Sequence, residues 1–260
     1  MKVIRSMSNP VVKHLRSLSQ KKYRHHAGTY IADGVLLVGE ALSCGTADVQ
    51  MLIVDAAKAD KFPALTEACR ERGIEILCVH EDVLRAVCDT KAPQGVAAVI
   101  GIPACDDAMP EGGLVLALED VSDPGNVGTL IRTADAAGAS MVLLSENCAD
   151  VYAPKVVRST MGSLYHLPVG CCRDIAKSVR QLKDGGFTVI AAHLDGETVG
   201  LNSQFPQNTV LLLGNEARGL SDELTALSDR KLKLPMAGKA ESLNVSVAGS
   251  VLMYLWLFQR

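Results

Sequence analysis

Apolar positions in the N-terminal part of the chain alternate between helical spacing and short continuous runs. Spacings of three and four residues predict helices, whereas apolar runs bounded by polar residues predict strands. Helices are expected to begin near Pro10 and Gly34 and to cover 62–72 and 82–87, and strands are expected at 49–54, 74–79 and 96–100. This pattern indicates a small α/β unit that ends near Ile102, where prolines and glycines at 103–113 predict a linker.

The rest of the chain alternates strands and helices more strictly. Residues 114–118 form a continuous apolar run, which is typical of a parallel strand buried on both faces. Further strands are expected at 141–144, 187–192, 210–213 and 231–234, and the two helices between them should stop at Gly138 and at Gly185 and Gly186. The expected fold class is therefore α/β, with a parallel sheet covered by helices over 114–260 and a smaller domain over 1–102.

Composition agrees with a globular protein, because 48% of the residues are hydrophobic and 21% are charged. The most apolar run, 245–258, is shorter than the roughly 20 residues that cross a bilayer. Residues 1–10 are polar and do not resemble a secretory signal. We therefore expect a cytoplasmic protein without a membrane partner.

The cysteines predict neither disulfides nor a metal site. All eight are scattered, no pair forms Cys-x-x-Cys, and no histidine stands at ligand spacing from any of them. Reduced thiols and no bound metal are the expectation for such a chain.

Charge is distributed unevenly, although the net charge is only −3. Seven of the 26 basic residues precede the first acidic residue, Asp33, which leaves 19 basic against 29 acidic residues for the rest. This basic arm either forms an ordinary solvated helix face or binds a polyanionic partner, and its one-sidedness favours the partner.

A first candidate segment, 120–138, runs from a strand end through a turn at Pro124 and Gly125 into a helix. Asn126 is a favoured N-cap type and should begin that helix, whose free N–H groups suit an anion. Arg132 lies two turns further on. A dinucleotide site, as in a nicotinamide-dependent oxidoreductase, is disfavoured because the fingerprint Gly-x-Gly-x-x-Gly is absent.

Two more segments place polar residues after expected strands. In 211–221 a buried strand ends directly in Gly214, Asn215 and Glu216, and ligands bind at the carboxyl ends of strands in open α/β sheets. In 234–247 a strand is followed by a loop that contains Ser242 and Asn244. Taken singly, these residues could also be an ordinary turn and ordinary helix caps.

Together and in this order, the three segments closely resemble the signature motifs of the SpoU (TrmH) family, part of the SPOUT superfamily of methyltransferases. Residues 152–162 resemble the family's linking segment. Residues 8–13 and 21–24 resemble its small substrate-binding domain, which is similar to ribosomal protein L30e. The resemblance covers nearly the whole chain.

The resemblance implies transfer of a methyl group from S-adenosylmethionine to a ribose 2′-hydroxyl of RNA. Ribosomal RNA is the preferred substrate, transfer RNA is the alternative, and a catalytically inactive RNA-binding or ribosome-assembly protein is a further one. The resemblance also implies a deep trefoil knot, a rare exception to the rule against threaded chains. A homodimer is expected through the apolar C-terminal helix around Trp256 and Phe258.

The resemblance assigns residues by position. The cofactor should lie among the loops 192–196, 214–219 and 234–244, and its expected contacts are Gly214, Leu234 and Leu243, with Leu194 and Met236 as weaker candidates. The catalytic set comprises Asn126, Arg132, Glu216, Ser242 and Asn244, and the expected RNA contacts are Lys13, Lys21, Lys22 and Arg24. Arg132 should assist loss of the 2′-hydroxyl proton or stabilise the developing alkoxide, and Glu216 should orient it.

Overall fold

The computed structural model describes residues 3–104, 108–200 and 203–259. The chain forms two compact units. The first comprises the chain up to Ala104 together with Asp150–His166. The second comprises the residues between Ala104 and Asp150 and those from Leu167 onward. Lys2, Cys105 and the middle of the expected linker lie outside the described residues.

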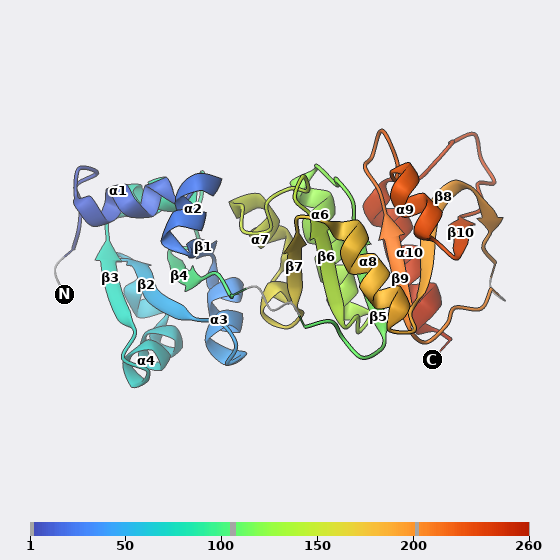
Figure 1. The fold of residues 1–260 in the computed structure, drawn as a ribbon. Helices are drawn as coiled ribbons and strands as arrows, with labels where there is room; N and C mark the ends of the chain where they lie inside the picture. The colour runs from blue at the N-terminus through green and yellow to red at the C-terminus, as the bar shows by residue number, and fades with distance from the viewer. Residues whose placement is uncertain (1–2, 105–107, 201–202, 260) are drawn as a thin grey trace. The chain divides into compact units, whose positions relative to one another are not determined.

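The first unit contains a four-stranded sheet in the order β1-β4-β2-β3 (Figure 1). The strands are β1 Thr29–Asp33, β2 Val49–Asp55, β3 Glu75–Val79 and β4 Val96–Gly101. β4 is antiparallel to β1 and to β2, whereas β2 and β3 are parallel. The strands expected at 49–54, 74–79 and 96–100 are confirmed. β1 was not predicted, since its five residues include only three apolar ones between two glycines.

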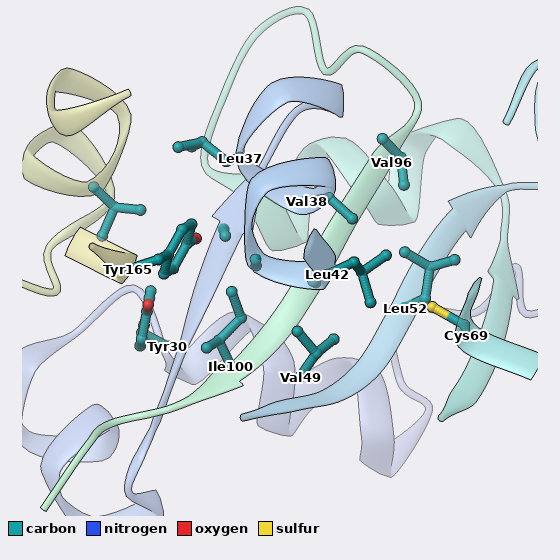
Figure 2. Close-up of a cluster of buried hydrophobic side chains, with 14 of the residues drawn as sticks. Tyr30, Leu37, Val38, Leu42, Val49, Leu52, Cys69, Val96, Ile100 and Tyr165 are labelled. Atoms are coloured by element: carbon teal, nitrogen blue, oxygen red, sulfur yellow. The ribbon is translucent and has the colours of Figure 1, made fainter. Parts of the chain in front are cut away.

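Helices cover both faces of this sheet. They are α1 Pro10–Ser17, α2 Lys21–Ala27, α3 Val35–Ser43, α4 Pro63–Glu71, α5 Glu81–Cys88 and α7 Pro154–Thr160, with 3₁₀ turns η1 Ala59–Lys61 and η2 Ser163–Tyr165. Successive strand residues alternate between two cores, as the pleat requires. Leu52 packs in the core with α3, and Ile53 packs in the core with α1 and α5. Figure 2 shows the first of these cores.

The second unit contains a six-stranded sheet in the order β10-β8-β9-β5-β6-β7. The strands are β5 Leu114–Leu118, β6 Met141–Ser145, β7 Val169–Cys172, β8 Thr188–Thr198, β9 Thr209–Leu213 and β10 Arg230–Lys233. Every neighbouring pair is parallel, which confirms the predicted parallel sheet. β7 was not predicted because its four residues, Val-Gly-Cys-Cys, carry a single aliphatic side chain.

Helices lie on opposite faces of the second sheet (Figure 1). They are α6 Pro124–Ala136, α8 Ile175–Asp184, α9 Asp222–Leu227 and α10 Val245–Leu257. α8 and α9 cover one face. α6 and α10 pack together on the other, so closely that a Cβ on Gly249 of α10 would lie 2.7 Å from Leu130 Cδ2 of α6. Gly138 and Gly186 follow α6 and α8 with φ of 70° and 91°, which confirms the predicted glycine stops.

The pairing of β10 with β8 is interrupted at the loop expected to contact the cofactor. Lys231 lies opposite Ala191, but Leu232 lies opposite Glu197, so residues 192–196 bulge out of the ladder. Gly196 makes this possible, because a Cβ there would lie 2.6 Å from Leu232 N. Among the residues that the structure describes, no helix is long and apolar enough to span a membrane.

Candidate active site

Four loops of the second unit meet at one edge of the sheet. β10, β8, β9 and β5 are consecutive parallel neighbours, so their carboxyl ends lie side by side. The loops 234–244, 214–219 and 119–123 follow β10, β9 and β5, and the bulge 192–196 lies in β8. Carboxyl ends of parallel strands are where α/β sheets bind ligands. The strand order thus brings together all three loops expected to hold the cofactor.

The turn after β9 is built by Asn215. Its backbone N–H donates to Gly219 O at 3.0 Å, and Gly219 N–H donates back to Asn215 O at 2.9 Å. Its side-chain Oδ1 accepts from the N–H groups of Ala217 and Arg218 at 3.0 and 3.1 Å. Asn215 was not among the predicted site residues, although its position directly after a strand was the available signal.

Gly214 is required by this same turn. A Cβ at Gly214 would lie 2.3 Å from Gly219 C and 2.4 Å from Leu220 N, closer than side-chain carbons approach backbone. A larger residue would therefore displace the turn that carries Glu216. The absence of a side chain at Gly214 serves the loop itself as well as any ligand that approaches it.

Glu216 gathers hydrogen bonds from the start of α6. One carboxylate oxygen, Oε1, accepts from Asn126 Nδ2 at 2.9 Å and from Asp123 N at 3.3 Å. The other, Oε2, accepts from both the N–H and the hydroxyl of Ser122 at 3.3 Å. Partial burial would raise the pKa of Glu216, but the hydrogen bonds from Asn126 and the backbone outweigh it and lower the pKa. Glu216 thus holds the start of α6 in place. The sequence predicted that it would orient Arg132, but its hydrogen bonds go to Ser122, Asp123 and Asn126.

The start of α6 differs from the prediction. The N-cap is Asp123, whose Oδ1 accepts from Gly125 N at 2.7 Å and Asn126 N at 3.0 Å, and Pro124 occupies the first helical turn. The prediction that Asn126 caps this helix is wrong, because the aspartate before the proline reaches the free N–H groups first. Asp123 also occupies the N–H groups that were expected to suit an anion.

Asn126 is instead the centre of a chain of side chains. Its Nδ2 donates to Glu216, and its Oδ1 accepts from Asn244 Nδ2 at 3.1 Å. Asn244 is the N-cap of α10, since its Oδ1 accepts from Ser246 N at 2.9 Å and Val247 N at 3.4 Å. Three residues of the expected catalytic set therefore meet, and they join the loops after β5, β9 and β10.

The other two residues of that set stand apart from this chain. Arg132 is exposed on α6, and its side chain makes no hydrogen bond or ion pair within the part of the chain that the structure describes. Ser242 is exposed two residues before the Asn244 cap. The guanidinium of Arg132 is thus a free positive charge on the helix that Glu216 anchors.

The residues expected at the cofactor present apolar surface on these loops. Leu194 is 64% exposed and Leu243 is 40% exposed, while Leu234, Met236 and Gly214 are half-buried. Exposure of leucine side chains to water is unfavourable, and their free energy falls when a flat apolar group covers them. Both leucines lie at the carboxyl edge of the sheet, Leu194 in the bulge of β8 and Leu243 on the loop after β10.

Asp120 stabilises the conformation of the loop after β5 through hydrogen bonds to neighbouring strand ends. It has φ of 55°, a left-handed conformation that is uncommon for residues other than glycine. Ser145 Oγ donates to its carboxylate at 2.7 Å and accepts from its N–H at 2.8 Å, and Asn215 Nδ2 donates to its carbonyl at 2.8 Å. Arg218 pairs with the same carboxylate at 3.3 Å. Sequence reasoning missed this support, which only the folded strand ends reveal.

The expected RNA contacts divide into two kinds. Lys13 on α1 and Lys21 and Lys22 on α2 are exposed. Arg24 is only 3% exposed, because its guanidinium donates to Leu18 O at 2.7 Å and forms an ion pair with Asp150. Its charge is therefore used inside the first unit, and of the four expected contacts the three lysines are surface cations.

Nothing described in the structure suggests a metal. Within the described ranges no group of three or more His, Cys, Asp or Glu side chains could hold a metal ion. The seven cysteines that the structure describes are all free thiols.

Comparison with known proteins gives matches over both units. The SpoU rRNA Methylase family matches residues 113–254, and the MRM3-like substrate binding domain matches residues 9–98. The chain is 36% identical over 98% of both lengths to the Bacillus subtilis 23S rRNA (guanosine(2553)-2′-O)-methyltransferase RlmP.

Two solved structures are similar throughout. An rRNA methyltransferase from Sinorhizobium meliloti with AdoMet bound has a TM-score of 0.86 and 33% identity, covering 98% of this chain and 96% of that one. The SpoU methyltransferase AviRb from Streptomyces viridochromogenes, in complex with AdoMet, has a TM-score of 0.84 and 30% identity, covering 97% and 98%.

Replacing Glu216 by glutamine should show a pH-dependent loss of stability. The pKa of Glu216 is lowered by folding, so its hydrogen bonds stabilise the fold above the ordinary pKa of about 4.3 and this stabilisation disappears as pH falls through the folded pKa. Glutamine offers one acceptor oxygen in place of two. The difference in melting temperature between wild type and Glu216→Gln should therefore be constant from about pH 8 to about pH 5.5 and shrink below about pH 4.

The matched control is Glu71→Gln, at an exposed glutamate on the end of α4. It should change the melting temperature little at each pH. A difference for Glu216→Gln that grows as the pH falls would contradict the role given to this carboxylate.

Proposed function

Because the chain belongs to the SpoU rRNA methylase family, we propose that it transfers a methyl group from S-adenosylmethionine to a ribose 2′-hydroxyl of ribosomal RNA. The observation that carries this proposal is the hydrogen-bonded chain Glu216–Asn126–Asn244 at the carboxyl edge of the sheet. The relative from Bacillus subtilis is named as a 2′-O-methyltransferase of 23S rRNA, and two similar structures hold AdoMet. Action on ribosomal RNA also favours a cytoplasmic location.

Catalysis here depends on position more than on acid–base chemistry. When bound, S-adenosylmethionine supplies an electrophilic methyl group on a sulfonium sulfur. The loops must hold the ribose oxygen in line with that group, and such positioning can supply several powers of ten in rate. The hydrogen bonds of Asn126 with Glu216 and Asn244 hold three loops at fixed separations. Glu216 is a poor base, since its pKa is lowered and both oxygens already accept hydrogen bonds.

Arg132 is the cation available for the substrate. It is exposed, and the described residues offer its side chain no partner. A guanidinium stays protonated and seldom acts as a base, so we assign Arg132 to the adjacent phosphate and to the alkoxide that develops as the 2′-hydroxyl proton leaves to solvent. Ser242 and Asn244 are assigned to the ribose and to the loop that carries it.

We also propose that the family's trefoil knot is present. The path of the chain supports it. From β9 the chain crosses β8 to reach β10 on the other side, and it then returns to place α10 against α6 and β9.

Replacing Arg132 by alanine should reduce methyl transfer to RNA by about 100-fold or more while cofactor affinity changes by less than about three-fold. The reason is that Arg132 lies on α6 and not on the loops assigned to the cofactor. Tritiated methyl transfer and calorimetry with S-adenosylmethionine measure the two effects.

The matched control is Arg180→Ala, an exposed arginine on α8, on the opposite face of the sheet. It should leave both quantities unchanged. Full activity of Arg132→Ala would remove this residue from the mechanism, and joint loss of activity and cofactor binding would make its role structural.

We propose that RNA binds the first unit through Lys13, Lys21 and Lys22. The lysines are exposed on α1 and α2, in a stretch with no acidic residue before Asp33. Neutralising phosphates releases counterions, so these lysines add affinity for any RNA without reading its sequence.

Replacing Lys21 and Lys22 by alanine should weaken binding to all RNAs alike. It should also flatten the log–log dependence of affinity on salt by roughly 0.7 to 0.9 for each phosphate that is no longer neutralised. Filter binding at several salt concentrations measures this. The control Lys61→Ala with Lys177→Ala removes the same charge from exposed lysines outside the arm. Equal affinity and slope in wild type and the arm variant would reduce the arm to a solvated helix face.

We further propose a homodimer through α10. One side of this apolar helix packs on its own unit, where Met253 and Trp256 are buried. What remains is one exposed apolar stripe at helical spacing, formed by Val247, Val251, Tyr254 and Phe258. Water disfavours such a stripe, and a second copy of it is self-complementary across a two-fold axis.

Light scattering at micromolar concentration should give the mass of a dimer for the wild type and of a monomer for Val251→Glu, because the glutamate would bury a charge in the interface. Val35→Glu is the matched control, since Val35 is 40% exposed and Val251 is 41% exposed. A monomeric wild type, or equal dissociation in both variants, would refute this interface.

A further inference from the structure

A segment from the middle of the catalytic sequence belongs to the first unit. Residues 150–166 lie in sequence between β6 and β7, yet they cluster with the N-terminal residues. α7 covers β1, and Val157 and Tyr165 are buried in the core that Figure 2 shows. The rings of Tyr152 and Tyr30 lie 4.9 Å apart. The substrate-binding unit is therefore completed by this segment.

The first residue of the segment is held by α2. Asp150 forms an ion pair with Arg24, and the two side chains are only 12% and 3% exposed. Arg24 also donates to Leu18 O at the end of α1, and Asp150 Oδ1 accepts from Tyr152 N at 3.1 Å. Lys21 and Lys22 of α2 are thus exposed to solvent, whereas Arg24 of the same helix is buried and paired with Asp150.

Ala149, which precedes Asp150, is hydrogen-bonded to the loop after β5. Ala149 N–H donates to Val121 O at 2.9 Å, and Cys148 Sγ donates to Leu118 O at 3.3 Å. Val121 is followed at once by Ser122 and Asp123, whose N–H groups donate to Glu216. One peptide bond, between Ala149 and Asp150, therefore joins a residue held by the catalytic loop to a residue held by α2.

We propose that Arg24 and Asp150 are positioning residues for methyl transfer, which act through Ala149 on the conformation of the catalytic loop 121–123. The proposal rests on the methyl-transfer function proposed above. A buried ion pair suits this task, because its members have no solvent to replace a missing partner, so Arg24 and Asp150 have one strongly preferred geometry. The rival explanation is that the pair only stabilises the first unit.

The experiment separates these two explanations by measuring four quantities on the full chain: kcat at saturating RNA, RNA affinity, S-adenosylmethionine affinity and melting temperature. The variants are Arg24→Met, Asp150→Asn, the double variant and Arg24→Lys. The matched control is Arg70→Met, which breaks the exposed Arg70–Glu67 ion pair in the same unit.

Each single neutral variant should lower kcat by about ten- to a hundred-fold, as expected when a bound substrate is misplaced by about 1 Å. RNA and cofactor affinities should change by less than about three-fold. The single variants should also melt earlier, since each leaves a buried charge unpaired. In the double variant the melting temperature should recover while kcat stays low. Arg24→Lys restores a charge at this position and should regain part of kcat, and Arg70→Met should match wild type.

Three outcomes would overturn the inference. Recovery of kcat together with melting temperature in the double variant would make the pair merely stabilising. Wild-type kcat in all variants would remove it from the reaction. Loss of RNA affinity without loss of kcat would make Arg24 a phosphate ligand. Failure of the proposed function is distinguishable, because it would appear in the wild type as absent methyl transfer and in Lys21→Ala/Lys22→Ala as unchanged RNA binding.

Discussion

The hydrogen bonds collected by the carboxylate of Glu216 are the constraint on which the active site depends. Glu216 stands on the turn that Asn215 closes, and its two oxygens accept from Ser122, Asp123 and Asn126. This interaction fixes where α6 begins. Asn126 then extends the link to Asn244 at the start of α10. Two helices and three strand ends are thus connected through one charged group and Asn126, and the lowered pKa of Glu216 extends its ionised state to lower pH.

Two arginines show how differently one residue type serves this chain. Arg132 is exposed and its side chain has no partner among the described residues, so its charge is available to a substrate. Arg24 is buried, and its charge is neutralised by Asp150. The first suits stabilisation of a charge that develops during reaction, and the second suits a permanent structural link. The basic arm of the sequence thus contains both surface cations and an arginine that forms a buried ion pair.

Much of the fold could be predicted from the sequence, because buried parallel strands such as 114–118 are continuous apolar runs and the helices between them keep their spacing. The meeting of Asn126, Glu216 and Asn244 could be expected from their motifs. The cap of α6 could not, since Asp123 and Asn126 are both good caps and only the fold shows which reaches the N–H groups. The placement of 150–166 was also beyond prediction, because the apolar pattern of Val157 and Tyr165 does not reveal which core receives them.

The most direct test of this account is a mass-spectrometric map of ribose methylation in RNA from cells with and without the gene. The account predicts that one nucleotide of ribosomal RNA loses a methyl group on its ribose 2′-oxygen when the gene is absent, and regains it when the gene is restored. A methyl group lost from a base, a change confined to transfer RNA, or identical maps from the two kinds of cell would contradict it.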